Sequence, residues 1–192
     1  GAPTLKAFLI QNRTLDPATL PLYYAMEYLW WHHVHASIGS LRVLSALIGS
    51  LATAVLVLFG RRLGGTPAGL MAGLCFAVSP IQIHHGQGIR MYVLFVLLAV
   101  LASWSFLELL RSPTPARWAA AFVCTLALSW THPFALLLPF VQGVFLLIAR
   151  PWPLRRFLFW CAVSGTALLP VAGYLSTVRF WPKDSTSQWL NM

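Results

Sequence analysis

The stretch SPIQIHHGQGIRMYVLFVLLAVLASW, residues 79–104, places side chains that can bind an anion at the mouth of a long apolar run. Arg90 offers a planar fork of N–H donors that matches the oxygens of a phosphate group. His84, His85 and Gln87 lie just before it and can donate hydrogen bonds to phosphate or hydroxyl groups. The sequence holds only four acidic residues, none of them in this stretch. We therefore expect a ligand, water or a lipid head group to supply the counter-ion of Arg90.

Each of these residues also has a plain structural explanation. An arginine at the end of a membrane helix can extend its apolar stem and reach lipid head groups. Interfacial histidines are often simply hydrated, and the adjacent side chains of His84 and His85 diverge too far on a helix to share a metal ion. We favour phosphate binding for Arg90 because a charge at a membrane boundary is costly and no acid lies near it in the sequence.

Four further residues could join such a site from other parts of the chain. Asp16 can act as a base or a metal ligand, although with Pro17 after it the residue also fits the N-cap of a helix. His132, in the turn SWTHPF, can lie over the site or be held by the backbone. Glu27 can face the same mouth, but a solvated helix face is the simpler interpretation. Arg42 is a second phosphate contact or, as we favour, an interfacial anchor.

The segment WWHHVHAS resembles a metal cluster at first sight. On a helix, however, His32 and His35 share a face and His33 does not. No acid or cysteine nearby completes a ligand shell, so a polar rim is favoured and no metal ligand is predicted. A divalent metal ion is compatible with a phosphate-binding site, but no ligand pattern supports one.

Composition identifies the solvent around the protein. Apolar residues make up 58% of the 192 and charged residues only 9%, whereas soluble domains average about 25% charged residues. Most of the surface must therefore face lipid, and the nine Trp and five Tyr residues fit interfacial belts. The cysteines are isolated in apolar stretches, without a disulfide framework or metal motif: Cys75, Cys124 and Cys161. We predict an all-α membrane protein.

Six apolar segments are candidates for membrane helices, which need about 20 residues to cross the hydrocarbon. They cover roughly 40–60, 66–83, 91–110, 117–131, 134–149 and 157–176. The fourth and fifth are short and meet at a proline-containing turn, so together they could form one broken hairpin. The expected order is the end of an outer loop at 1–19, an interfacial amphipathic helix at 20–36, a transmembrane bundle at 37–176 and an outer segment at 177–192.

Positive charge indicates the orientation. The loops GRRLGG, RSPTPAR and RPWPLRR fall on one side of the six-span arrangement, and by the positive-inside rule that side is cytoplasmic. The net charge of +9 therefore needs no nucleic acid as its explanation. Glu108, the acid near the cytoplasmic side, is predicted to pair with Arg111 three residues later. The candidate site residues then lie on the opposite, periplasmic or lumenal face.

The order of motifs resembles a known family. P-L-Y-Y precedes an aromatic segment, then come G-S-L-R-V-L-S-A-L, G-R-R-L at the far end of the span, S-P, Q-x-x-R-M-Y and a later T-H. This set is similar to the polytopic glycosyltransferases of the GT-C fold, which include protein O-mannosyltransferases and lipid A aminoarabinose transferases. The resemblance covers about residues 14–150, and the ordered set with matching topology makes it fairly specific.

The resemblance implies an enzyme that transfers a sugar from a polyprenyl-phosphate donor to a lipid, glycan or protein acceptor. Transfer would occur on the outer face, by direct displacement at the anomeric carbon. Together with the polar residues around Arg90, the resemblance predicts Asp16 and His132 as catalytic residues of this sequence. The residues predicted to bind the substrate are Arg90, Tyr92, His84, His85, Gln87, Tyr23 and Tyr24.

The sequence departs from the family pattern at several positions. Gly88 stands where a glutamate is common, Leu20 stands where a second proline is usual, and Asp16 is one residue further from Pro21 than expected. The first membrane helix of the family and the acid that follows it are absent from this sequence. We therefore expect a truncated domain that lacks its main catalytic carboxylate.

A transporter or flippase of lipid-linked phosphate intermediates is the alternative from another class. It would need ionisable or helix-breaking residues near the middle of the membrane, whereas the polar groups here lie at the helix ends. A structural membrane subunit would explain the spans but not the polar mouth. The Leu/Ala/Arg-rich composition favours a bacterial inner membrane, with the active face periplasmic or extracellular.

Overall fold

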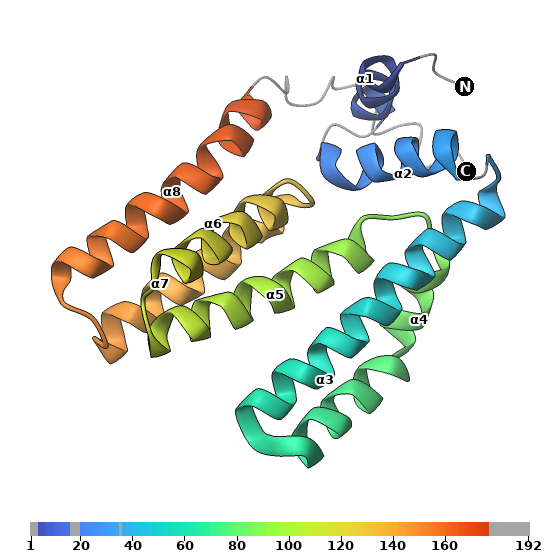
Figure 1. Ribbon diagram of the computed structural model, residues 1–192. Coiled ribbons are helices and arrows are strands. Elements are labelled where there is room, and N and C mark those ends of the chain that lie inside the picture. The colour runs from blue at the N-terminus through green and yellow to red at the C-terminus, as the bar shows by residue number, and fades with distance from the viewer. Residues whose placement is uncertain (1–3, 16–19, 35, 177–192) are drawn as a thin grey trace, which may run out of the picture.

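The computed structural model describes residues 4–15, 20–34 and 36–176, and every regular element in these ranges is helical (Figure 1). The predicted all-α class is confirmed. Asp16, His35 and the predicted outer segment 177–192 lie outside the described residues. The elements are α1 Leu5–Leu15, α2 Pro21–His33, α3 Ile38–Ala77, α4 Pro80–Gln87, α5 Tyr92–Arg111, α6 Pro115–Ser129, the 3-10 turn η1 Pro133–Leu136, α7 Leu137–Ala149 and α8 Leu154–Ser176.

Three of the described helices, α3, α5 and α8, are long and apolar enough to cross a membrane. All six predicted apolar segments are helical, but α6 and α7 have only 15 and 13 residues. They are the two segments that the sequence marked as short. Large apolar side chains such as Leu70, Phe140 and Ile148 are exposed on the outside of the helices. Such a surface requires lipid around it, so the chain is an integral membrane protein.

The helix α3 consists of two helices joined by a sharp bend. Gly64 and Gly65 leave the helical conformation, and Gly65 has φ +78°, a region that glycine adopts far more readily than other residues. The second half then folds back beside the first (Figure 1). A Cβ atom on Gly69 or Gly73 would collide with Val57, so glycines allow this close approach. The predicted segments 40–60 and 66–83 therefore form a helical hairpin.

The helix α5 is central to the bundle, because it packs against both α3 and α6, and α6 packs in turn against α8. Two apolar clusters lie near its two ends. The first joins α2, α3 and α5 and includes Tyr23, Leu44, Ile48, Ala52, Met91, Val93, Leu94 and Leu97. The second joins α5 to α6, α7 and α8 and includes Phe106, Leu109, Ala121, Leu146, Trp152 and Trp160.

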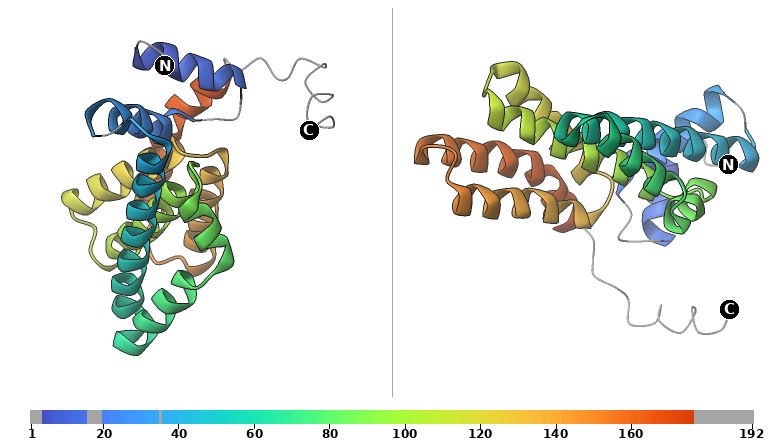
Figure 2. Two further views of the ribbon diagram at one scale, coloured as in Figure 1. Left: turned by 90° about the vertical axis from the view of Figure 1, so that its right-hand side faces the viewer. Right: turned by 90° about the horizontal axis from the view of Figure 1, so that it is seen from below.

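The helix α2 lies across one end of the bundle, with α1 on its outer side (Figure 2). Pro21 occupies its first turn, where the missing N–H of proline has no cost. We call this end of the bundle the α2 end. The helix α1 falls within the segment predicted as an outer loop. Hydrogen bonds that hold α2 to the bundle include Leu22 N to Trp130 O (3.2 Å), Trp30 Nε1 to Ser40 Oγ (2.7 Å), and the pair of Tyr23 Oη and Ser45 Oγ (2.7 Å).

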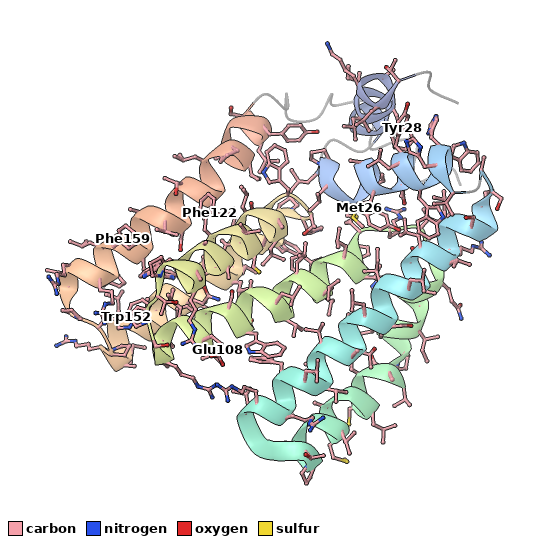
Figure 3. The ribbon with its side chains drawn as sticks, in the orientation of Figure 1. Met26, Tyr28, Glu108, Phe122, Trp152 and Phe159 are labelled. Carbon is pink, nitrogen blue, oxygen red and sulfur yellow. The ribbon has the colours of Figure 1, made fainter. Side chains whose placement is uncertain are left out.

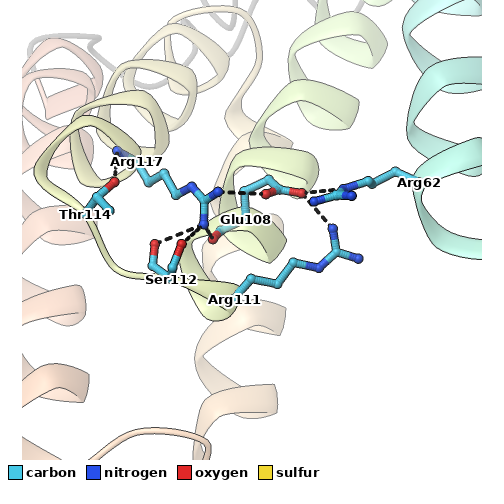
Figure 4. A network of polar contacts seen from close by, with 6 residues as sticks. All are labelled: Arg62, Glu108, Arg111, Ser112, Thr114 and Arg117. Atoms are coloured by element: carbon cyan, nitrogen blue, oxygen red, sulfur yellow. Dashed lines mark hydrogen bonds and ion pairs between the residues drawn. The ribbon is translucent and has the colours of Figure 1, made fainter.

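Glu108 joins three helices at the opposite end, which we call the arginine end (Figure 4). Its Oε1 accepts hydrogen bonds from Arg62 Nε at 2.9 Å and from Arg111 Nη1 at 2.7 Å. Its Oε2 lies 3.3 Å from Arg117 Nη2. Arg117 Nη1 also donates to the main-chain oxygens of Glu108 and Ser112, at 2.9 and 3.2 Å. The predicted pair of Glu108 and Arg111 is confirmed, and the structure extends it to α3 and α6.

Candidate functional site

Arg90 lies at the α2 end, in the short bend between α4 and α5. The helix α4 ends at Gln87, Gly88 adopts an extended conformation, and α5 begins at Tyr92. The break in the helix brings the guanidinium of Arg90 to the mouth of the apolar helix α5, where its side chain is exposed. This is the location that the sequence predicted.

A row of imidazole and phenol rings surrounds this bend. The ring centroids of His84 and His85 are 5.4 Å apart, those of His85 and Tyr92 4.4 Å, and those of Tyr92 and His132 5.9 Å. The row joins α4, α5 and the turn before η1. The structure therefore brings together four of the predicted site residues from three separate segments.

Two imidazoles of the row, those of His85 and His132, are suited to donate hydrogen bonds. Partial burial and the adjacent His84 hold the pKa of His85 below its ordinary value, so this ring is neutral at pH 7 and keeps one N–H donor. His132 Nδ1 accepts a hydrogen bond from Phe134 N at 3.1 Å, which assigns the proton of the neutral ring to Nε2. Gln87 is exposed at the end of α4. The α2 end thus offers several donors beside the cation of Arg90.

Tyr23 and Tyr24 connect α2 to the helices below it. Their rings meet edge to face, with centroids 5.7 Å apart. Tyr23 is fully buried and its hydroxyl pairs with Ser45, while the Tyr24 hydroxyl lies 3.8 Å from Met91 Sδ. Both predicted residues contact the bundle through their hydroxyl groups, and so they fix the position of α2 above the site.

Glu27 is buried, so the interpretation as a solvated helix face is wrong. The residue is only 6% exposed, and its Oε1 is the one buried side-chain oxygen or nitrogen among the described residues that lacks a hydrogen-bond partner. The reason is helical geometry: Glu27 lies one turn after Tyr23, on the same face of α2. That face packs against α3, as the bond between Tyr23 and Ser45 demonstrates. The four-residue spacing from Tyr23 shows that the two residues share a face of α2, but it does not show that this face is buried.

Burial raises the pKa of Glu27 to about 7, although a hydrogen bond from Tyr23 and the positive charge of Arg90 both act to lower it. Arg90 therefore has a protein carboxyl group in its electrostatic neighbourhood. The expectation that only a ligand, water or lipid would supply its counter-ion missed this group. Because the carboxyl is only about half ionised at pH 7, it neutralises Arg90 incompletely.

The remaining candidates are dispersed. Arg42 is exposed in the first turns of α3. His32 packs on the Tyr28 ring at 4.0 Å, and its Nδ1 lies 2.8 Å from Tyr28 O. Figure 3 shows Tyr28 on the side of α2 that faces α1, whereas Met26 points toward the bundle. Within the described residues, no three His, Cys, Asp or Glu side chains lie close enough together to hold a metal ion.

The family model for dolichyl-phosphate-mannose-protein mannosyltransferases matches residues 21–181. The chain belongs to this family. The match begins with α2 and includes Glu27, Arg90 and His132. Neither a curated protein nor a solved structure shows a significant match to the chain. The predicted resemblance to membrane glycosyltransferases of the GT-C type is confirmed, and family membership indicates a glycosyltransferase of the mannosyltransferase type that uses a lipid-linked sugar.

Proposed function

We propose that the α2 end binds the phosphate of a polyprenyl-phosphate sugar and that the sugar is transferred there to an acceptor. The observation that carries this proposal is the position of Arg90 beside the ring row of His84, His85, Tyr92 and His132. Family membership supports a lipid-linked donor. The seven arginines predicted to be cytoplasmic lie at or near helix ends and bends toward the other end of the bundle, which supports a periplasmic or extracellular location for the α2 end.

The reaction places its strongest demand on the leaving phosphate. Displacement at the anomeric carbon forms a bond to the acceptor oxygen and breaks the bond to the phosphate oxygen, so negative charge grows on the phosphate. A guanidinium and neutral N–H donors that already face this position stabilise that charge without reorganisation. Arg90 supplies the cation, and His85 and His132 supply N–H donors.

The acceptor also loses a proton, which requires a base. Asp16 and His132 are the catalytic residues predicted from the sequence. Since His132 Nδ1 accepts the Phe134 N–H, this nitrogen does not take a proton from the acceptor, and the proton of the neutral ring is on Nε2. We therefore favour donation to the phosphate for His132, and Asp16 as the base.

Arg90→Ala in the full-length protein tests the proposal directly. Hydrogen bonds to charged groups contribute about 1.5–3 kcal/mol each, so the variant should bind undecaprenyl phosphate in detergent roughly 10- to 100-fold more weakly. Arg42→Ala is the matched control, because it removes an exposed arginine near the same end of the bundle. Affinity that falls equally in both variants, or in neither, would assign Arg90 to membrane anchoring.

The flippase alternative has weaker support. Between α5, α6, α7 and α8 the described structure contains a small cavity with three uncharged polar residues in its lining, Thr125, Gln142 and Ser164. A pathway for a charged phosphate through the membrane would require ionisable groups at that depth. Sugar transfer by purified protein in detergent, where no bilayer has to be crossed, would favour the enzyme over the flippase.

A further inference from the structure

A groove at the arginine end has no role in the proposed glycosyl transfer. It opens between the loop after α5, the first turn of α6 and the first two turns of α8. Its lining residues are Pro113, Trp118, Arg155, Arg156 and Phe159. The groove therefore combines two cations with two aromatic rings at the end of a membrane helix.

The aromatic wall of the groove is supported from behind. The rings of Trp118 and Phe159 meet edge to face, with centroids 4.7 Å apart, and Trp118 also contacts Trp152 at 5.8 Å. Trp152 is only 9% exposed and belongs to the apolar cluster at this end. Figure 3 shows Trp152 near the arginine end and Phe159 on α8. The wall is thus anchored in packed core.

The two arginines of the groove have no ion pair with any described residue. Every described ion pair is made by Glu108, whose two oxygens already contact Arg62, Arg111 and Arg117. Arg155 and Arg156 lie in the first turn of α8, which contains no acidic side chain. The partial positive charge of a helix N-terminus adds to theirs. Both the charge and the free donors therefore favour an anionic ligand.

The surface beside the groove indicates where this anion comes from. Leu154 and Leu158 are 69% and 55% exposed on α8, and Phe159 is 54% exposed. Because α8 is long and apolar enough to cross the membrane, these exposed apolar side chains suit contact with acyl chains. We propose that the groove binds the head group of an anionic phospholipid, with the phosphate between Arg155 and Arg156 and the acyl chains along α8.

Binding of phosphatidylglycerol to the full-length protein in detergent, measured by native mass spectrometry, tests this proposal. Arg155→Gln with Arg156→Gln should weaken phosphatidylglycerol binding at least 10-fold, since two charge-assisted contacts are lost. Phosphatidylcholine should bind weakly to both proteins. The conservative pair Arg155→Lys with Arg156→Lys should retain most of the binding, which separates loss of charge from loss of folding.

Arg61→Gln with Arg150→Gln is the matched control, because it removes two arginines at the same end of the bundle but outside the groove. Its phosphatidylglycerol affinity should equal that of the unchanged protein. If both double variants lost the same amount of phosphatidylglycerol affinity, the proposal would be overturned, because the lipid would then be attracted by the overall positive charge of the arginine end. Competition by inorganic phosphate at the same concentration as the lipid would overturn it in favour of a soluble anion. Donor binding through Arg90 should be unaffected, so this proposal and the proposed function can fail separately.

Discussion

The two carboxylates of the described chain lie at opposite ends of the bundle under opposite conditions. Glu108 is partly exposed and contacts three arginines within 3.3 Å. Glu27 is buried under α2, makes no ion pair within the described residues and keeps one oxygen without a partner. The same side chain therefore joins helices at one end and creates an electrostatic cost at the other.

This difference separates a structural role from a functional one. Both carboxylate oxygens of Glu108 have partners, and the network holds α3 near its bend, the end of α5 and the start of α6 together (Figure 4). A buried carboxyl with a missing partner destabilises the folded state, and such groups concentrate at functional sites. Glu27 lies in the electrostatic neighbourhood of Arg90, the residue that we propose to bind phosphate. The carboxyl group with one oxygen that lacks a hydrogen-bond partner therefore lies in the neighbourhood of the candidate site.

Glu27→Gln should give the largest effect on stability. With the pKa raised from 4.5 to about 7 in the folded protein, the folded state keeps the proton longer than the unfolded state. The stability of the unchanged protein should therefore fall as pH rises from 4.5 to about 7, by about 3 kcal/mol in all. Glutamine has no charge to bury, so the variant should be more stable above pH 7. Thermal unfolding followed by tryptophan fluorescence from pH 5 to 8.5 measures this difference.

The same variant has a second readout at the proposed site. An ionised Glu27 repels a phosphate near Arg90, so Glu27→Gln should bind undecaprenyl phosphate more tightly than the unchanged protein at pH 8. The two proteins should bind it equally at pH 5, where Glu27 is protonated. If the melting temperatures of the two proteins followed the same pH profile, the prediction that Glu27 titrates near pH 7 would be wrong.

Ser45→Ala should have an intermediate effect. The Ser45 hydroxyl pairs with the buried Tyr23 hydroxyl at 2.7 Å, and loss of one such hydrogen bond costs about 1 kcal/mol. Ser50→Ala is the control, because Ser50 is exposed on the same helix and bonds only to the Ala46 carbonyl one turn before it. Chemical unfolding should separate the two variants. Equal stability would mean that the contact of α2 with α3 does not depend on this pair.

Glu108→Gln should have the smallest effect and the opposite sign to Glu27→Gln above pH 7. Glutamine cannot neutralise Arg62, Arg111 and Arg117, so the melting temperature should fall slightly. Because these groups are accessible to water and ions, the difference should shrink in 1 M salt. A larger loss of stability than in Ser45→Ala, independent of salt, would show that the two ends do not differ as we describe.

The helical segments and the polar residues around Arg90 were predictable because both depend on patterns within short stretches of sequence. Apolar run length defines the helices, and the motif around Arg90 lies within one short stretch. The pair of Glu108 and Arg111 followed from its three-residue spacing. Arg62 and Arg117 could not be assigned to the same carboxylate, since each reaches it from another helix and no spacing within one helix predicts such a contact.

The misassignment of Glu27 has a different cause. Its neighbours on α2 are aromatic on several sides, so periodicity did not reveal which face would be buried. The answer came from the contacts of Tyr23 with Ser45 and of Trp30 with Ser40, which turn that face toward α3. The sequence of one helix does not specify which other helix will pack against each of its faces.

The sequence by itself determined that this protein is a helical membrane protein, and it located the cation of the candidate site. These properties follow from composition and local spacing, which are fixed before the chain folds. Only the tertiary structure decided that Glu27 is buried within the electrostatic neighbourhood of Arg90, that His85, Tyr92 and His132 form one row, and that Arg155 and Arg156 share a groove with Trp118. Burial and charge neighbourhood depend on packing between distant segments, and packing sets the chemistry of each group.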